Sequence, residues 1–182
     1  QGGGERIGGI IGTSSEPTSF TNVYVLAGTV QGSNFVGGLI GYSNQTTNVT
    51  NSYANITKAG GIGVKGDGFV GGLIGRFGEY GKVVDSHFAG AITANYNYGG
   101  LVGYFGIGPY ISNSHYDIDN SKINGAATVT IGGLFSGQYS TWFNNGLRNG
   151  LNSWNATAAT AAFGAADGNG YFSIDQADLG NL

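Results

Sequence analysis

Short apolar phrases broken by glycine pairs recur along the chain and organise it. The plainest copy is Phe69–Gly75, and related phrases surround the glycine pairs that begin at Gly8, Gly37, Gly99 and Gly132. The first glycines of successive pairs are separated by 29, 34, 28 and 33 residues. Repetition at such a period is typical of folds built from stacked repeats.

A polar phrase follows the first four glycine pairs at a constant distance. An Asn or Asp lies 14 positions after the first glycine of the pair in all four copies, as Asn22, Asn51, Asp85 and Asn113. This constant part indicates fixed structure, whereas the variable links 55–68 and 117–130 suit loops. We interpret the Asx residues as turn residues that bond their own backbone or a neighbouring repeat.

The repeats predict strands, because Val, Ile, Thr, Tyr and Phe dominate them and no helical stripe precedes about residue 138. A unit of about 28 residues holds about three short strands, which is one coil of a β-solenoid. Glycine should allow close backbone approach or supply a positive φ at corners. At least one of three stacked ladders should fill the interior: Ile10-Leu39-Leu73-Leu101-Leu134, Ile11-Ile40-Ile74-Val102-Phe135 and Phe20-Val49-Val83-Ile111.

The repeat pattern ends near residue 136, which predicts solenoid repeats over 1–136 and a capping or boundary segment over 137–182. A short helix over 138–143 would lay Trp142 and Phe143 on the last coil, and Trp154 and Phe163 would anchor the polar, Ala-rich stretch after it. We therefore expect about four to five coils and an irregular, partly helical C-terminal cap. Because the chain starts almost inside a repeat, we expect it to be a piece of a longer protein.

Composition narrows the possible partners. Charged residues make up only 9% of the chain and hydrophobic residues 40%, which argues against disorder. The net charge of −3 and the lack of a basic stripe argue against nucleic acid as a partner. No apolar run is long enough for membrane insertion. The absence of cysteine excludes disulfides and thiol catalysis, and it fits an extracellular chain.

The candidate catalytic residues are two carboxylates, Asp117 and Asp119. They would share a face if 116–120 were a strand, as in β-helical enzymes that cleave polysaccharides. Those enzymes usually need a further acid or base and a basic residue in the cleft, and only Lys122 and Arg148 lie near in sequence. Solvated turn carboxylates are the favoured interpretation.

Two histidines occupy one repeat position. His87 and His115 align with Tyr24 and Tyr53, so stacked coils would place them about 5 Å apart. This spacing permits a shared metal, but the aligned tyrosines favour an aromatic ladder. With no cysteine and no third ligand in register, we expect no metal site and no cofactor.

Each of three further features can be explained either without a specific function or by one. The segment 165–176 resembles a calcium-binding loop at Asp167 and Asn169, but its first and last ligand positions carry Ala165 and Gln176, so a plain turn is favoured. Sequons begin at Asn44, Asn48, Asn55 and Asn155, either by chance or as sites of glycosylation. Tyr42, Tyr104 and Tyr110 form a possible carbohydrate platform, although tyrosine also favours strands for packing alone.

The phrases Val-Gly-Gly-Leu-Ile-Gly-Tyr (36–42) and Thr-Asn-Ser-Tyr-Ala (50–54) resemble the GLUG repeat of bacterial surface proteins. The passage 112–143 is similar to the segment after such repeats in filamentous-haemagglutinin-type adhesins of two-partner secretion, and 170–174 to the block that comes next in them. This resemblance implies a right-handed parallel β-helix in a secreted or cell-surface protein of a Gram-negative bacterium. It carries no catalytic residue.

These observations lead to one functional expectation and two alternatives. We expect a non-catalytic structural and adhesive segment that forms a rigid stalk and offers its loops for contact. Its partners would be a host or environmental surface, with carbohydrate as one candidate ligand, the rest of a larger parent chain, and that chain's outer-membrane secretion partner. The alternatives are a carbohydrate-active β-helix enzyme and a carbohydrate-binding surface module.

Overall fold

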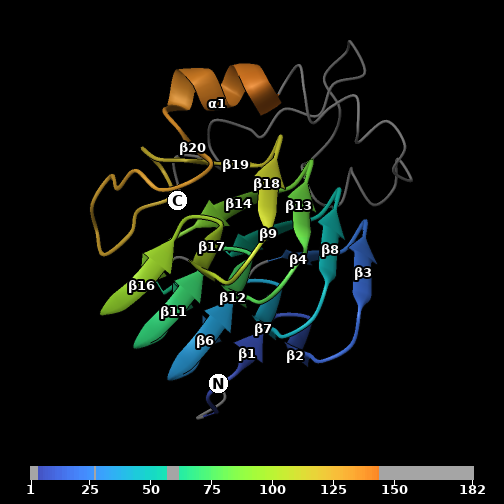
Figure 1. Cartoon of the computed structure of the whole chain (residues 1–182). Helices are drawn as coiled ribbons and strands as arrows, with labels where there is room; N and C mark the ends of the chain where they lie inside the picture. Colours follow the sequence, from blue (N-terminus) through green and yellow to red (C-terminus); the bar gives the residue numbers. More distant parts are fainter. Residues whose placement is uncertain (1–3, 27, 57–61, 144–182) are drawn as a thin grey trace.

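The computed structural model describes residues 4–26, 28–56 and 62–143. Their regular structure is almost entirely β, and the strands lie in parallel sheets that each combine strands from successive repeats (Figure 1). This arrangement is consistent with a β-solenoid, and the prediction of a mostly β fold is confirmed. No helix among these residues is long and apolar enough to cross a membrane.

Within the described residues the strands form five sheets, and neighbours within each sheet come from neighbouring repeats. One sheet contains β1 (Ile7–Gly8), β6 (Asn34–Gly37), β11 (Gly68–Gly71) and β16 (Tyr96–Gly99). The next contains β2 (Ile11–Ser14), β7 (Ile40–Ser43), β12 (Ile74–Phe77) and β17 (Val102–Phe105). A third contains β3 (Thr18–Thr21), β8 (Thr47–Thr50), β13 (Lys82–Val84) and β18 (Tyr110–Ser112).

The remaining strands complete the repeats. The fourth sheet contains β4 (Tyr24–Leu26), β9 (Tyr53–Ile56), β14 (His87–Gly90), β19 (His115–Asp117) and β20 (Gly133–Leu134). A short sheet contains β5 (Val30–Gln31), β10 (Val64–Lys65) and β15 (Ile92–Thr93). The helix α1 (Ser136–Trp142) comes directly after β20.

The register follows the glycine pairs. Gly37 pairs with Gly8 on one side and with Gly71 on the other, and His87 pairs with Tyr53 and His115. The repeat alignment predicted from the sequence is therefore confirmed for the first four copies.

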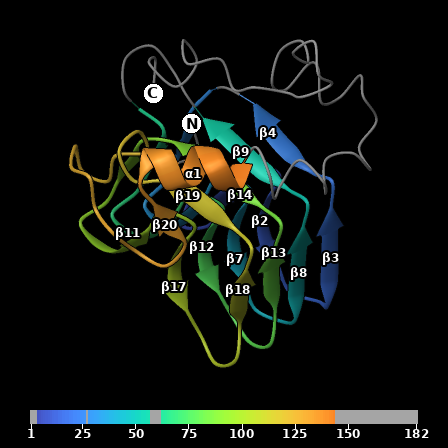
Figure 2. The ribbon, with the colours of Figure 1, turned by 90° about the horizontal axis from the view of Figure 1, so that it is seen from above.

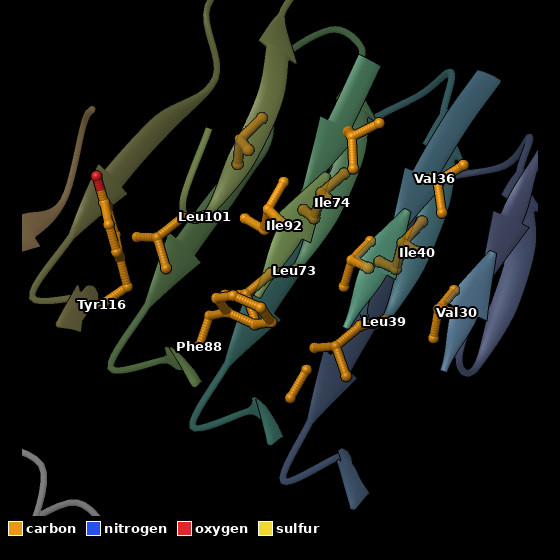
Figure 3. Close-up of a cluster of buried hydrophobic side chains, with 14 of the residues drawn as sticks. Val30, Val36, Leu39, Ile40, Leu73, Ile74, Phe88, Ile92, Leu101 and Tyr116 are labelled. Carbon is orange, nitrogen blue, oxygen red and sulfur yellow. The ribbon is translucent and has the colours of Figure 1, made fainter. Parts of the chain in front are cut away.

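The interior is filled by the predicted ladders (Figure 3). Side chains from successive repeats converge on one continuous core, and within the central repeats all three ladders are buried: Leu39, Leu73, Leu101, Ile40, Ile74, Val49 and Val83. Ile10, in the first repeat, is 45% exposed, because it lies at the edge of this core. Burial of equivalent apolar residues is what joins the repeats.

The fifth glycine pair does not stack on the other four. Gly133 pairs with Tyr116, and Leu134 with Asp117, so β20 extends the fourth sheet. The predicted continuation of two ladders to Leu134 and Phe135 is therefore wrong, and Phe135 is 54% exposed. The physical reason is that a Gly-Gly-Leu phrase fits wherever neighbouring backbone approaches closely, so the phrase alone does not select a sheet.

The glycine pairs serve close packing between repeats. A Cβ added at Gly37 would lie 2.1 Å from the carbonyl oxygen of Ile40 and 2.6 Å from the amide nitrogen of Gly75. One added at Gly72 would lie 2.1 Å from the carbonyl oxygen of Gly100 and 2.3 Å from Cγ of Phe88. The predicted role in close backbone approach holds at these positions.

Asx side chains occupy left-handed corners. Asn22, Asn51, Asp85 and Asn113 have φ between 45° and 57°. Asn and Asp adopt this region more readily than most residues. The amide of Asn113 donates a hydrogen bond to the Asp85 carboxylate at 2.5 Å. Both predicted features, the turn position and the bond to a neighbouring repeat, are therefore present.

The short helix α1 lies against β19 and β20, as seen from above in Figure 2. The Trp142 ring meets His115 edge-on at 4.6 Å, and its indole N–H donates to Oδ1 of Asn113 at 2.6 Å. Phe143 meets the His87 ring edge-on at 5.3 Å. A helix was predicted over 138–143, and α1 spans Ser136–Trp142. Trp142 packs on the fourth repeat as expected, whereas Phe143 contacts His87 in the third.

Candidate functional site

A row of alternating tyrosine and arginine side chains crosses β7, β12 and β17, three strands of the sheet β2–β7–β12–β17. Tyr42 on β7, Arg76 on β12 and Tyr104 on β17 are direct register partners. All three lie five positions after the first glycine of their repeat. Arg6, before β1, adds a second guanidinium group next to Tyr42. We call these four residues the Tyr–Arg ladder.

Cation–π contacts hold the ladder together. The Arg76 guanidinium carbon lies 5.1 Å from the centroid of the Tyr42 ring and 5.7 Å from that of Tyr104. The Arg6 guanidinium carbon lies 4.8 Å from the Tyr42 centroid. Arg76 also donates a hydrogen bond to the Tyr42 hydroxyl at 3.2 Å, and this hydroxyl donates to Oδ1 of Asn44 at 2.8 Å. The geometry fixes the direction of both tyrosines.

A pocket of about 300 Å³ opens beside the ladder. It is formed by the ends of β7, β12 and β17 and by the turns that follow them, and its lining residues are Tyr42, Asn44, Arg76, Gly78, Glu79, Tyr104, Phe105, Gly106 and Ile107. The lining combines aromatic and aliphatic surface with one cation, one carboxylate and one amide. Pockets of this kind are typical of small-molecule sites.

The guanidinium groups of the ladder lack acidic partners among the described residues. In residues 4–26, 28–56 and 62–143, neither Arg6 nor Arg76 forms an ion pair. Glu79 lines the same pocket as Arg76 but is exposed and makes no salt bridge to it within this part of the chain. Arg76 therefore retains N–H donors that can bind a ligand.

Two phenylalanines with unusual backbone support this surface. Phe35 and Phe69 have φ of 51° and 55°, a region that bulky residues rarely adopt. Their rings stack at 4.8 Å, and Phe69 meets Tyr104 edge-on at 5.6 Å. Such strained positions persist only where the surroundings over-determine them, and they often mark functional surfaces.

The three predicted ligand-contact tyrosines are not all together. Tyr42 and Tyr104 share the pocket, and Tyr104 is 41% exposed. Tyr110 lies on β18, where it pairs with Lys82 in a different sheet, and is 54% exposed. Ligand contact by these tyrosines remains a prediction, and Tyr110 belongs to a separate patch.

Asp117 and Asp119 are not a pair on one strand face. The strand β19 ends at Asp117, and Asp119 lies in the turn after it, so the geometry assumed for a catalytic pair is wrong. Asp117 is 2% exposed, which also corrects its interpretation as a solvated carboxylate. Its oxygens accept hydrogen bonds from the backbone N–H of Asp119 at 2.9 Å and from the side chains of Asn120 and Ser136, each at 2.9 Å. These contacts tie the start of α1 to the turn.

His87 and His115 belong to an aromatic ladder. Tyr24 stacks on Tyr53 at 5.3 Å, and Tyr53 stacks on His87 at 4.9 Å with nearly parallel rings. Burial lowers the pKa of His87 to about 3 and also lowers the pKa of His115, whose Nδ1 lies 3.0 Å from the Gly132 carbonyl oxygen. Neutral imidazoles suit stacking between aromatic rings.

The remaining candidates are metal sites, the sequons and the segment that resembles a calcium-binding loop. Among the described residues, no group of three or more His, Asp or Glu side chains is placed to hold a metal ion. Asn44 is exposed, whereas Asn48 and Asn55 are half-buried. The fourth sequon at Asn155 and the calcium-loop-like segment 165–176 lie outside the described residues.

Sequence reasoning missed the charged residues of this site, Arg6, Arg76 and Glu79. For Arg76 a signal was present, because Arg76 stands five positions after Gly71, as Tyr42 and Tyr104 stand after Gly37 and Gly99.

Comparison with protein-family models, with curated proteins and with solved structures finds no match. The chemistry of this site must therefore be argued from its own residues.

Proposed function

We propose that this chain is a non-catalytic structural and adhesive segment of a secreted or cell-surface bacterial adhesin. In this proposal the repeats form a right-handed parallel β-helix of about four to five coils, and the residues from 137 onward form a partly helical cap. The resemblance to GLUG repeats and to filamentous-haemagglutinin-type adhesins supports the proposed class. The proposed partners are a host or environmental surface, the rest of a parent chain and its outer-membrane secretion partner.

One observation carries the proposal. Equivalent residues of the first four repeats pair in parallel in the sheets, and one uninterrupted apolar core runs through them. Each repeat thus buries its apolar side chains only against its neighbours, so the unit can be added end to end. A stack of this kind resists bending because every added repeat extends several sheets at once.

Insertion of extra repeats tests whether the chain forms a rigid rod. Three extra copies of residues 37–70 placed after residue 70 should lengthen the particle by about 15 Å, because stacked strands lie about 4.8 Å apart. Small-angle scattering measures this increase in maximum dimension, and circular dichroism checks that the extended protein remains β-rich. An unchanged length, or expansion to a flexible chain, would contradict the proposed stalk.

A second experiment addresses the catalytic alternative. The burial of Asp117 and its hydrogen bonds to the α1 region favour a structural role for this carboxylate. We expect the chain to release no product from a panel of polysaccharides, and the double variant Asp117→Asn/Asp119→Asn to behave alike. Cleavage by the original chain that disappears in the double variant would overturn the non-catalytic proposal.

A further inference from the structure

We propose that the pocket beside the Tyr–Arg ladder binds an acidic sugar, with the sugar carboxylate on Arg76. This inference goes beyond the proposed stalk and does not depend on it. A rod needs no pocket, and a ladder that served packing alone would need no guanidinium that lacks an acidic partner in the part of the chain that the structure describes. The pocket and such a guanidinium, that of Arg76, lie together on one surface.

Arg76 supplies the charge recognition. Its guanidinium is held between the Tyr42 and Tyr104 rings and is oriented by its hydrogen bond to the Tyr42 hydroxyl. A guanidinium presents its remaining N–H groups in a planar fork that matches the two oxygens of a carboxylate. Because the side chain is already fixed, little conformational entropy is lost when the ligand binds.

The rest of the lining favours a sugar over a carboxylate alone. Tyr104 and Ile107 are exposed and offer apolar surface for the C–H face of a pyranose ring. Asn44 and Glu79 lie on the turns at the same rim and can bond ring hydroxyls, with Glu79 as acceptor. A volume of about 300 Å³ accommodates a ligand of one or two rings.

The position of the pocket along the rod is also informative. It spans the ends of β7, β12 and β17, so three successive repeats contribute to it. The other register partner of Tyr42 in this sheet is Thr13 on β2, so the alternation of ring and guanidinium at this repeat position covers only three of the strands. The site is therefore a local feature of these repeats and not a general property of the fold.

The test compares three probes on the intact chain. Methyl β-D-glucuronide carries the ring and the carboxylate, methyl β-D-glucoside carries the ring alone, and acetate carries the carboxylate alone. We expect the glucuronide to bind at least about tenfold more tightly than either partial probe, because it uses both parts of the site. Chemical shifts of backbone amides, followed by NMR during titration, give the affinities and locate the site.

Matched variants assign the binding to Arg76. Arg76→Gln should weaken glucuronide binding by about tenfold or more, whereas Lys82→Gln, a cation on β13 that does not line the pocket, should leave the affinity unchanged. Asn44→Ala removes an exposed lining residue and should weaken binding with less risk to folding. Thermal melts confirm that each variant is folded.

Several outcomes would overturn the proposal. Absence of glucuronide binding in the millimolar range, equal affinity for the glucoside, or an unaltered affinity in Arg76→Gln would each reject an acidic-sugar site. Equal affinity for acetate would reject the sugar. None of these results would change the maximum dimension of the protein with inserted repeats. A failure of the proposed sugar site can therefore be distinguished from a failure of the proposed stalk.

Discussion

At the scale of single residues, Gly72 lies where a side chain would meet both the backbone of the next repeat and a buried ring of its own repeat. A Cβ there would lie 2.1 Å from the Gly100 carbonyl oxygen and 2.3 Å from Cγ of Phe88. Backbone and a buried ring cannot both yield, so Gly72→Ala should lower the free energy of unfolding by about 2 kcal/mol or more. Equilibrium denaturation measures the change.

The same substitution at Gly137 is the matched control. An added Cβ at this position meets no atom within 4 Å, and Gly137 lies in α1. Because alanine favours helix over glycine by up to about 1 kcal/mol, Gly137→Ala should leave stability unchanged or raise it. Equal losses in both variants would show that close packing is not what requires glycine at position 72.

Asn51 allows a test of the left-handed corners. Its φ of 49° is costly for alanine but not for glycine. Asn51→Ala should therefore destabilise the fold by about 1 kcal/mol, while Asn51→Gly should have little effect. Thermal denaturation of the two variants separates backbone conformation from any loss of side-chain bonding, which would affect both alike.

At the scale of elements, a serine ladder joins the corners of adjacent repeats. The Ser86 hydroxyl donates to the Val84 carbonyl oxygen at 2.8 Å and accepts from the Ser52 backbone N–H at 3.1 Å. The Ser86 N–H in turn donates to the hydroxyl of Ser114 at 3.1 Å. Each serine hydroxyl thus donates a hydrogen bond within its own turn and accepts one from a backbone N–H of the preceding repeat.

Ser86→Ala should leave the Ser52 N–H buried without this acceptor. The expected loss is about 1–3 kcal/mol of unfolding free energy, because an unsatisfied buried donor is costly. Ser112→Ala, at an exposed position on β18, should change stability by less than about 0.5 kcal/mol. Urea denaturation of the two variants measures both changes, and similar losses would argue against a role for the ladder.

The helix α1 is held by Asp117, which offers a local probe of this element. Asp117→Asn replaces one acceptor oxygen by a donor facing Ser136 and Asn120, so α1 should detach from β19 at a cost of about 2–4 kcal/mol. With Trp154→Phe as background, Trp142 is the sole tryptophan and its emission should shift to the red. Asp67→Asn, at an exposed position, should leave the emission as it was.

At the scale of the whole molecule, the constant distance between Gly-Gly and Asx allowed the register to be predicted. It holds because each copy needs glycine for close approach and an Asx residue for a left-handed corner, so both ends of the constant segment are fixed. The fifth copy was misplaced for the same reason. Position 146, 14 residues after Gly132, is glycine and not Asx, so the second half of the signal is missing there.

Only part of the candidate site could be predicted from the sequence. Tyr42 and Tyr104 were recognised as possible contact residues by type, but nothing in their local sequence indicates a pocket. Arg76 enters the site only because parallel stacking brings residues from repeats 28 to 34 positions apart to one place. Glu79 and Ile107 both stand eight positions after the first glycine of their repeat, inside the constant segment, but they differ in residue type, so this position gave no signal of a shared site.

A stacked aromatic ladder with neutral histidines makes the stability of the whole molecule depend on pH. His87 is 1% exposed, faces Tyr53 and Phe143, and pairs with His115. Burial lowers its pKa to about 3 and lowers that of His115 in the same direction. In the unfolded chain a histidine titrates near a pKa of about 6.5.

Proton binding by the unfolded chain sets the sign of this dependence. Between pH 6.5 and 3 the unfolded state binds a proton at position 87 that the folded state does not, so stability is complete above pH 6.5 and falls as the pH decreases. Well below pH 6.5 the loss is about 1.4 kcal/mol for each pH unit. The loss of unfolding free energy between pH 7.5 and 4.5 should therefore be roughly 3 kcal/mol larger in the original chain than in His87→Phe, which keeps a stacking ring. His115→Phe leaves His87 in place and should retain most of the acid sensitivity. An equal loss of unfolding free energy in the original chain and in His87→Phe would instead mean that His87 is protonated in the folded state at pH 4.5.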